Sequence, residues 1–320
     1  MKFTSKTAVS LVLTWGLASG VFVTGHARVL QDGNASSVSM DLGVVTPFDY
    51  PGAAGTLAAD INAEGAIVGR YSKAGLTHGF LRSPEGDFTP IDYPGALLTV
   101  AAAINDDGAI AGQYSLPSAP TQRHGFLLKD GQFTTFDPPG SKFTNALGIN
   151  ESGDIVGRYC TLSFCGMPGT GNFHGFLLRD GEITTIDVPG ALETDAFKIS
   201  GSGDIVGGFL TPDRKEQFFV WSHDEFTTFA LPGGQPVSLD NGGINERGEL
   251  VGVYCDSALP CLIVPMGTHG LLMSSGNFNT IDIPGARATS ALGINARGDI
   301  VGQYADATGN HAFLLSRSRN

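Results

Sequence analysis

The stretch Asp282-Ile-Pro-Gly-Ala-Arg-Ala-Thr-Ser-Ala-Leu-Gly-Ile-Asn295, followed by Gly298-Asp-Ile-Val-Gly-Gln-Tyr304 and His311-Ala-Phe-Leu-Leu315, is one of six related copies in this 320-residue chain. Its Asp/Ala-x-Pro-Gly element recurs every 43 to 52 residues or so, beginning at Asp49, Asp92, Asp137, Asp187, Ala230 and Asp282. Its Ile-Asn-x-x-Gly element begins at Ile61, Ile104, Ile149, Ile199 (with Ser200 in place of Asn), Ile244 and Ile294. A repeat of this length is typical of a β-propeller, because one repeat cannot bury its own faces and must stack on its neighbours.

Each repeat divides into four short strands. In the copy quoted above they are Phe278–Ile283, Thr289–Asn295, Asp299–Tyr304 and His311–Leu315. The Asn-x-x-Gly element predicts a tight turn, and dipeptides such as Asp130-Gly131 predict two-residue hairpin turns. Four strands per repeat match a propeller blade. The sequence therefore predicts an all-β fold, a six-bladed β-propeller of four-stranded blades.

The hairpin turns also predict which residues lie opposite one another. Counting outward from each turn pairs a histidine with the aspartate that precedes Pro-Gly, giving His78–Asp92, His124–Asp137, His174–Asp187 and His269–Asp282. In the fourth repeat both members are lost together, as Gln217 and Ala230. His311 and Asp49 are then left over at opposite ends of the chain. We expect the strand around Asp49 to pair beside His311 and close the ring, which removes the exposed edges of an open sheet.

The repeated histidine has two interpretations. One is metal ligation or acid-base chemistry, and the other is a cross-strand hydrogen bond to aspartate that fixes each blade. Five of the seven histidines occupy this one repeat position. Because equivalent sites spread around a ring cannot all serve one active site, we favour the structural interpretation.

The N-terminus predicts export. Residues 1–27 have a basic start, an uncharged apolar stretch and small residues before a cleavage point after Ala27, as in a secretory signal peptide. Residues 28–40 form a polar lead-in, and residues 41–320 form a single propeller domain. We expect a secreted or periplasmic monomer with no membrane span in the mature protein. The formal net charge of -12 argues against nucleic acid and against an anionic membrane surface as partners.

The four cysteines agree with export. Cys160 and Cys165 follow Tyr159, and Cys255 and Cys261 follow Tyr254, so both pairs occupy the same loop in two repeats. Local disulfides Cys160–Cys165 and Cys255–Cys261 are the favoured interpretation in an oxidising compartment. A zinc site that used all four thiols would require loops of non-adjacent blades to meet.

Over residues 41–320 the repeats resemble a known family. The elements Gly-Asp-Ile-Val-Gly and His-Ala/Gly-Phe-Leu are similar to those of the HAF-type extracellular repeats, named for the His-Ala-Phe found here at His311 to Phe313. The function of that family is largely unassigned, so the resemblance implies secretion and a repeat fold but no residue-level chemistry. The order Gly-Ile-Asn-x-x-Gly-Asp-Ile-Val-Gly is also similar to NHL-type and gluconolactonase-type six-bladed propellers, as a likeness of fold.

Candidate site residues occur where the repeats stop agreeing. Four residues before each Ile-Asn or Ile-Ser pair, at what we call the mouth position, stand Leu57, Val100, Asn145, Asp195, Asp240 and Ser290. Three consecutive repeats thus carry Asn, Asp and Asp on the innermost strand, and Glu193 and Asn241 lie close by in sequence. Oxygen ligands of this type suit calcium. We expect Asn145, Asp195 and Asp240 to be metal ligands, or else merely to solvate the channel mouth.

Two classes of function follow, and we expect the first of them, the hydrolase, with the binding propeller as the alternative. A bound calcium ion would polarise the carbonyl of an ester or lactone and activate water, with Asp240 as the catalytic base of a secreted hydrolase. The alternative is a non-catalytic propeller that recognises a glycan, an envelope component or a protein through its variable loops, such as 159–174 and 254–269. The lack of a second domain favours a self-contained enzyme, whereas the lack of a histidine constellation aimed at the channel disfavours one.

Overall fold

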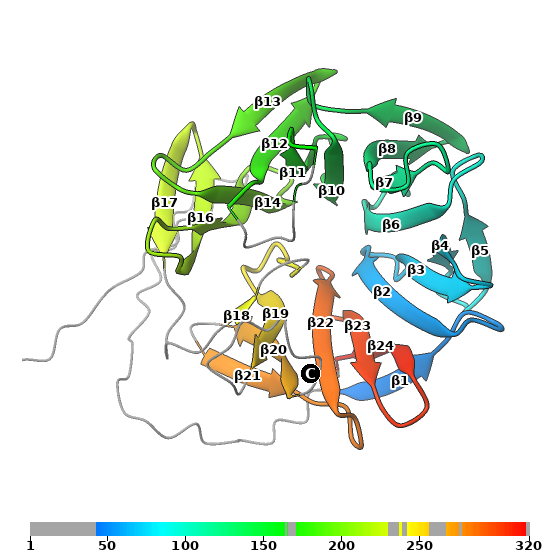
Figure 1. Cartoon of the computed structure of the whole chain (residues 1–320). Coiled ribbons are helices and arrows are strands. Elements are labelled where there is room, and N and C mark those ends of the chain that lie inside the picture. Colours follow the sequence, from blue (N-terminus) through cyan, green and yellow to red (C-terminus); the bar gives the residue numbers. More distant parts are fainter. Residues whose placement is uncertain are drawn as a thin grey trace, which may run out of the picture.

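A computed structural model describes residues 43–163, 165, 171–229, 237–238, 242–255, 267–274 and 277–317. Within these residues the structure consists of β-strands and connecting turns, with no helix (Figure 1). The strands are β1 (Val44–Phe48), β2 (Gly55–Ile61), β3 (Ile67–Lys73), β4 (Leu76–Arg82), β5 (Phe88–Ile91), β6 (Leu98–Ile104), β7 (Ile110–Ser115), β8 (His124–Lys129), β9 (Gln132–Phe136), β10 (Phe143–Ile149), β11 (Ile155–Cys160), β12 (His174–Arg179), β13 (Glu182–Ile186), β14 (Glu193–Ile199), β15 (Ile205–Leu210), β16 (Glu216–Ser222), β17 (Glu225–Phe229), β18 (Val237–Ser238), β19 (Leu250–Cys255), β20 (Thr268–Ser274), β21 (Asn277–Ile281), β22 (Ala288–Ile294), β23 (Ile300–Ala305) and β24 (Asn310–Ser316). The predicted all-β class is confirmed.

Consecutive strands pair antiparallel in units that follow the sequence repeat. Units 1 to 5 are β2–β5, β6–β9, β10–β13, β14–β17 and β18–β21, and unit 6 combines β22–β24 with β1. In Figure 1 the units are arranged around a central axis, with β2, β6, β10, β14 and β22 innermost. The arrangement is propeller-like. We call the end that carries the Pro-Gly turns the loop face, and the end that carries the Asn-x-x-Gly turns the turn face.

The two ends of the described chain meet in unit 6. Strand β1 pairs with β24 in antiparallel register from Val44 opposite Ser316 to Phe48 opposite Ala312. This is the pairing that the leftover His311 and Asp49 predicted.

A relay of side-chain amides joins neighbouring units on the turn face. Each turn asparagine donates from Nδ2 to the carbonyl oxygen of the corresponding residue in the next unit. The bonds are Asn62 to Asn105 (3.3 Å), Asn105 to Asn150 (3.0 Å), Asn150 to Ser200 (3.2 Å), Asn245 to Asn295 (3.0 Å) and Asn295 to Asn62 (3.1 Å). The last bond connects unit 6 to unit 1. The step from unit 4 to unit 5 is missing because Ser200 has no amide.

The core lies between neighbouring units. Ala58 and Ile61 of β2, for example, pack against Val301 and Ala312 of unit 6. Each unit other than unit 5 also buries a phenylalanine of its third strand over a glycine of its second, and a Cβ on Gly69 would lie 2.9 Å from the Phe80 ring. This close approach explains the repeated Val-Gly and His-x-Phe elements.

The inner strands crowd the axis. All of them except the short β18 shift register near their ends, as between Ala58 and Asp60 on β2, so one residue of each strand is left out of the pairing. Small residues fit here: a Cβ on Gly293 would lie 2.8 Å from the Cα of Asp60.

One predicted disulfide is observed, between Cys160 and Cys165. The other, Cys255–Cys261, involves Cys261, which lies outside the described residues. The predicted signal peptide (1–27) and lead-in (28–40) also lie outside them.

Candidate functional site

Two of the three predicted ligands lie at the channel mouth. Asn145 on β10 and Asp195 on β14 occupy equivalent positions in units 3 and 4, and both are buried. Asp240, predicted as a ligand and as the catalytic base, lies outside the described residues, as does Asn241. The predicted set of calcium ligands therefore stays a prediction.

An arginine that the sequence reasoning missed lies beside them. Arg158 on β11 is the cross-strand partner of Asn145, and its Nη1 is 3.3 Å from Oδ2 of Asp195 in the next unit. The two charged side chains are only 5% and 11% exposed. The guanidinium also lies over the ring of Phe173, 5.4 Å from its centroid. Asp195 is thus the anion of a buried ion pair, and a calcium ion at this carboxylate would have to compete with Arg158.

The repeat itself contains the signal for Arg158. The residue after each Val-Gly or Ala-Gly is polar in four repeats: Arg70, Gln113, Arg158 and Gln303. In the structure these residues lie directly opposite the mouth positions Leu57, Val100, Asn145 and Ser290. Comparing these four residues with the mouth residues of the following repeats would have predicted a cation, Arg158, beside Asp195.

The disulfide-bearing loop after β11 packs on the same region. The backbone amide of Gly171 donates to Oε2 of Glu193 (2.7 Å), and Asn172 Nδ2 donates to the carbonyl oxygen of Cys165 (3.2 Å). Phe173 is fully buried between this loop and Arg158. The ring of Phe173 therefore covers the Arg158 side of the Arg158–Asp195 pair.

A second ion pair crosses the axis. Lys198 Nζ on β14 is 2.9 Å from Oδ2 of Asp60 on β2, and each side chain is 12% exposed. The same oxygen accepts a hydrogen bond from the backbone amide of Ile104 (3.2 Å). Units 1 and 4 lie across the ring from one another in Figure 1. These charges neutralise each other deep in the channel.

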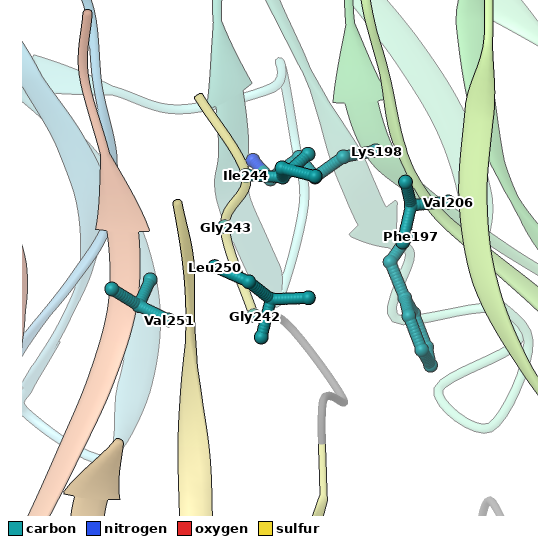
Figure 2. A pocket seen from close by; sticks show the side chains of 8 residues that line it. All are labelled: Phe197, Lys198, Val206, Gly242, Gly243, Ile244, Leu250 and Val251. Atoms are coloured by element: carbon teal, nitrogen blue, oxygen red, sulfur yellow. The ribbon is translucent and has the colours of Figure 1, made fainter. Parts of the chain in front are cut away.

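A small cavity lies between unit 4 and unit 5. Figure 2 shows Phe197 and Lys198 on one side and Leu250 and Gly243 on the other. Its volume of about 10 Å³ holds roughly one water molecule. It is therefore no substrate pocket. Within the described residues, no three histidine, cysteine, aspartate or glutamate side chains cluster so as to hold a metal ion.

The loop face carries a repeated polar and aromatic constellation, which we call a station. In each station a histidine Nδ1 bonds an aspartate carboxylate: His78–Asp92 (2.8 Å), His124–Asp137 (2.7 Å), His174–Asp187 (2.8 Å), His269–Asp282 (2.8 Å) and His311–Asp49 (2.7 Å). All five predicted pairs are confirmed. Each imidazole also lies against a tyrosine of the second strand, at a centroid distance of 5.0 to 5.4 Å: Tyr71, Tyr114, Tyr159, Tyr254 and Tyr304. The histidine side chains are 21% to 45% exposed.

Two stations are extended by a further aromatic ring. Tyr50 stacks on Tyr71 at 3.6 Å, and Tyr93 stacks on Tyr114 at 3.5 Å. Burial and the neighbouring Tyr93 raise the pKa of Tyr114 to about 12, although its hydrogen bond with Thr135 acts in the opposite direction. The phenol is therefore neutral and can donate a hydrogen bond.

The station of unit 6 has an additional partner. His311 Nε2 lies 2.8 Å from Thr308 Oγ1, and the carboxylate of Asp306 accepts from the hydroxyl and the backbone amide of Thr308. The hydrogen bond with Asp49 raises the pKa of His311 in spite of partial burial, and Asp306 adds to the effect. A positive imidazolium between two carboxylates is thereby favoured.

These features define the class as an all-β, propeller-like fold. No protein-family model matches the chain, and no curated protein matches it. Solved structures do. A protein assigned as TolB from Agrobacterium tumefaciens matches with a TM-score of 0.54 and 15% identity, over 82% of this chain and 91% of that one. A triple mutant of AofleA from Arthrobotrys oligospora matches with a TM-score of 0.51 and 15% identity, over 88% and 90%. At these identities the likeness shows the fold alone.

Proposed function

We propose that the chain is an extracytoplasmic six-bladed β-propeller of the HAF-repeat type that binds a ligand on its loop face without catalysing a reaction. In this proposal units 1 to 6 are the blades, and the pairing of β1 with β24 is the closure. The Cys160–Cys165 disulfide supports an oxidising compartment. Within the described residues no helix is long and apolar enough to cross a membrane.

The observation that carries this proposal is the set of five stations. In each one the imidazole and the carboxylate are partly open to solvent. The partly exposed ring is the station tyrosine itself in units 3, 5 and 6, whereas in units 1 and 2 the station tyrosine is buried and the partly exposed ring is the one stacked on it, Tyr50 or Tyr93. A flat ring with adjacent donors and acceptors suits a ligand that has both apolar faces and hydroxyl groups, as a glycan does. Five near-identical stations around one face would give a repetitive ligand avidity beyond that of a single contact.

A calcium-dependent hydrolase of a lactone or ester is the second candidate. One observation favours it: Oδ1 of Asn145 is buried and has no hydrogen-bond partner among the described residues, and a calcium ion would satisfy it. In this proposal Asn145 and Asp195 are ligands, and Asp240 is a ligand or the base. Arg158 opposes it, because its guanidinium already neutralises Asp195 and would repel a cation.

Two measurements on the mature protein separate the candidates. Titration with repetitive neutral and acidic glycans should show binding that weakens when Tyr159 and His174 are both replaced, as Tyr159→Leu and His174→Asn. A matched control replaces Gln217 and Phe209, which occupy the station positions of unit 4, where the histidine and aspartate are missing. Calcium-dependent, chelator-sensitive turnover of lactones or esters, with no glycan binding, would favour the hydrolase instead.

A further inference from the structure

Arg70 and Arg158 occupy the same position two repeats apart. Arg70 on β3 is the cross-strand partner of Leu57, and Arg158 on β11 is the cross-strand partner of Asn145. Arg158 reaches into the next unit and pairs with the mouth residue Asp195. In the unit that follows Arg70, the mouth residue is Val100. Arg70 therefore has the same position as Arg158, but the place of the partner carboxylate is taken by an apolar side chain.

Arg70 is an exposed residue, and its guanidinium has no counter-ion among the residues that the structure describes. It makes no hydrogen bond or ion pair with any residue that the structure describes, and the residue is exposed. The surrounding strands nevertheless desolvate it enough to lower its pKa. Exposure combined with desolvation is characteristic of a charge in a recess, where an anion binds more strongly than on an open surface.

Two amide side chains follow along the same rim, of which Gln113 is half-buried and Asn145 is buried. Gln113 is the cross-strand partner of Val100, and by the repeat it faces Asn145 as Arg158 faces Asp195. The side-chain oxygens of both amides are buried and lack a hydrogen-bond partner among the described residues. Asn145 is only 6% exposed. Buried acceptors of this kind call for donors, and a hydroxyl group is a suitable one.

We propose that Arg70, Gln113 and Asn145 form a binding site for a small hydroxylated carboxylate, such as a uronic acid unit. The ligand carboxylate pairs with Arg70 above Val100 as the carboxylate of Asp195 pairs with Arg158, and ligand hydroxyls donate to the two amide oxygens. The net charge of -12 disfavours a polyanion, so the site suits a single acidic sugar or a chain end. This inference rests on the proposed binding function, and it names a ligand class for the channel mouth.

Calorimetric titration of the mature protein with D-galacturonate, D-galactose and inorganic phosphate tests the site. Galacturonate should bind at least about tenfold more tightly than either of the others, because only it offers both the charge and the hydroxyls. Arg70→Gln should remove that preference. Arg297→Gln, at an exposed arginine of the turn face that pairs with Asp299, is the matched control and should leave it unchanged.

A second variant copies the carboxylate of Asp195 into unit 2, and it tests the site without removing any residue that is proposed to bind the ligand. Val100→Asp places a carboxylate where Asp195 stands in unit 4, so it should pair with Arg70, abolish galacturonate binding and leave the melting temperature equal to or above that of the parent. Tight galacturonate binding by this variant would overturn the proposed position of the ligand.

Other results also decide the matter. Equal affinity for galactose and galacturonate would overturn the role of Arg70, and equal affinity for phosphate would show an anion site without hydroxyl recognition. Binding of glycans that depends on Tyr159 and His174 but not on Arg70 would leave the proposed function standing and reject this site. Binding of no probe and no glycan would reject both.

Discussion

Position 200 carries serine where five other repeats carry asparagine, and the amide relay on the turn face stops there. The Ser200 hydroxyl is used locally: it accepts from the backbone amide of Asp204 (3.0 Å) and bonds Ser202 (2.8 Å). Ser200→Asn should retain the turn and add a bond from the new Nδ2 to the carbonyl oxygen of Asn245. The free energy of unfolding should rise by about 1 kcal/mol. Denaturant unfolding measures it, with Ser202→Asn as a control in the same turn that cannot reach unit 5. A lower midpoint would show that units 4 and 5 are not juxtaposed as units 3 and 4 are.

The His311 station predicts a pH dependence with a definite sign. Because Asp49 raises the pKa of His311 above its ordinary 6.5, the folded state holds this proton more tightly than the unfolded state. The stabilisation is complete below pH 6.5 and is lost as the pH rises through the raised pKa of the folded state. Unfolding midpoints measured from pH 6 to pH 9 should therefore fall, and Asp49→Asn should flatten this part of the curve. A parent curve as flat as that of the variant would contradict the prediction.

At the scale of single elements, the Cys160–Cys165 disulfide between β11 and β12 is expected to stabilise its own loop more than the whole fold. It closes only a few residues, so replacing Cys160 and Cys165 together by serine should cost roughly 2 kcal/mol or less. Hydrogen exchange at Gly171 and Phe173 should accelerate, because Gly171 is tied to Glu193 and Phe173 packs on Arg158. Amides of β2 and β3 in unit 1 serve as the internal control and should keep their protection. Global unfolding of the variant would show that the loop supports the whole ring.

The same scale shows why some contacts were predictable and others were not. Four of the His–Asp pairs follow from hairpins whose loop lengths fix the register, so counting along the sequence is sufficient. The fifth, His311–Asp49, follows because these two residues were left without partners. Arg158–Asp195 and Asp60–Lys198 join different repeats, and their partners depend on how the units are rotated and spaced. Sequence reasoning found Asn145 and Asp195 as exceptions in the mouth column. The sequence prediction made them ligands of calcium, because it did not compare the repeat position on the neighbouring strand, where Arg158 lies.

At the scale of the whole molecule, the ion pair between Lys198 and Asp60 is a test of the ring itself. These residues come from units 1 and 4, and only a ring-like arrangement brings them to 2.9 Å. Lys198→Met leaves the largely buried Asp60 without its counter-ion and should cost roughly 3 kcal/mol. The double variant Lys198→Met with Asp60→Leu should recover most of that loss, because two apolar side chains then meet at the axis. A double-mutant cycle from denaturant unfolding gives the coupling directly. Additive losses, with no recovery in the double variant, would mean that units 1 and 4 do not face each other across a common axis.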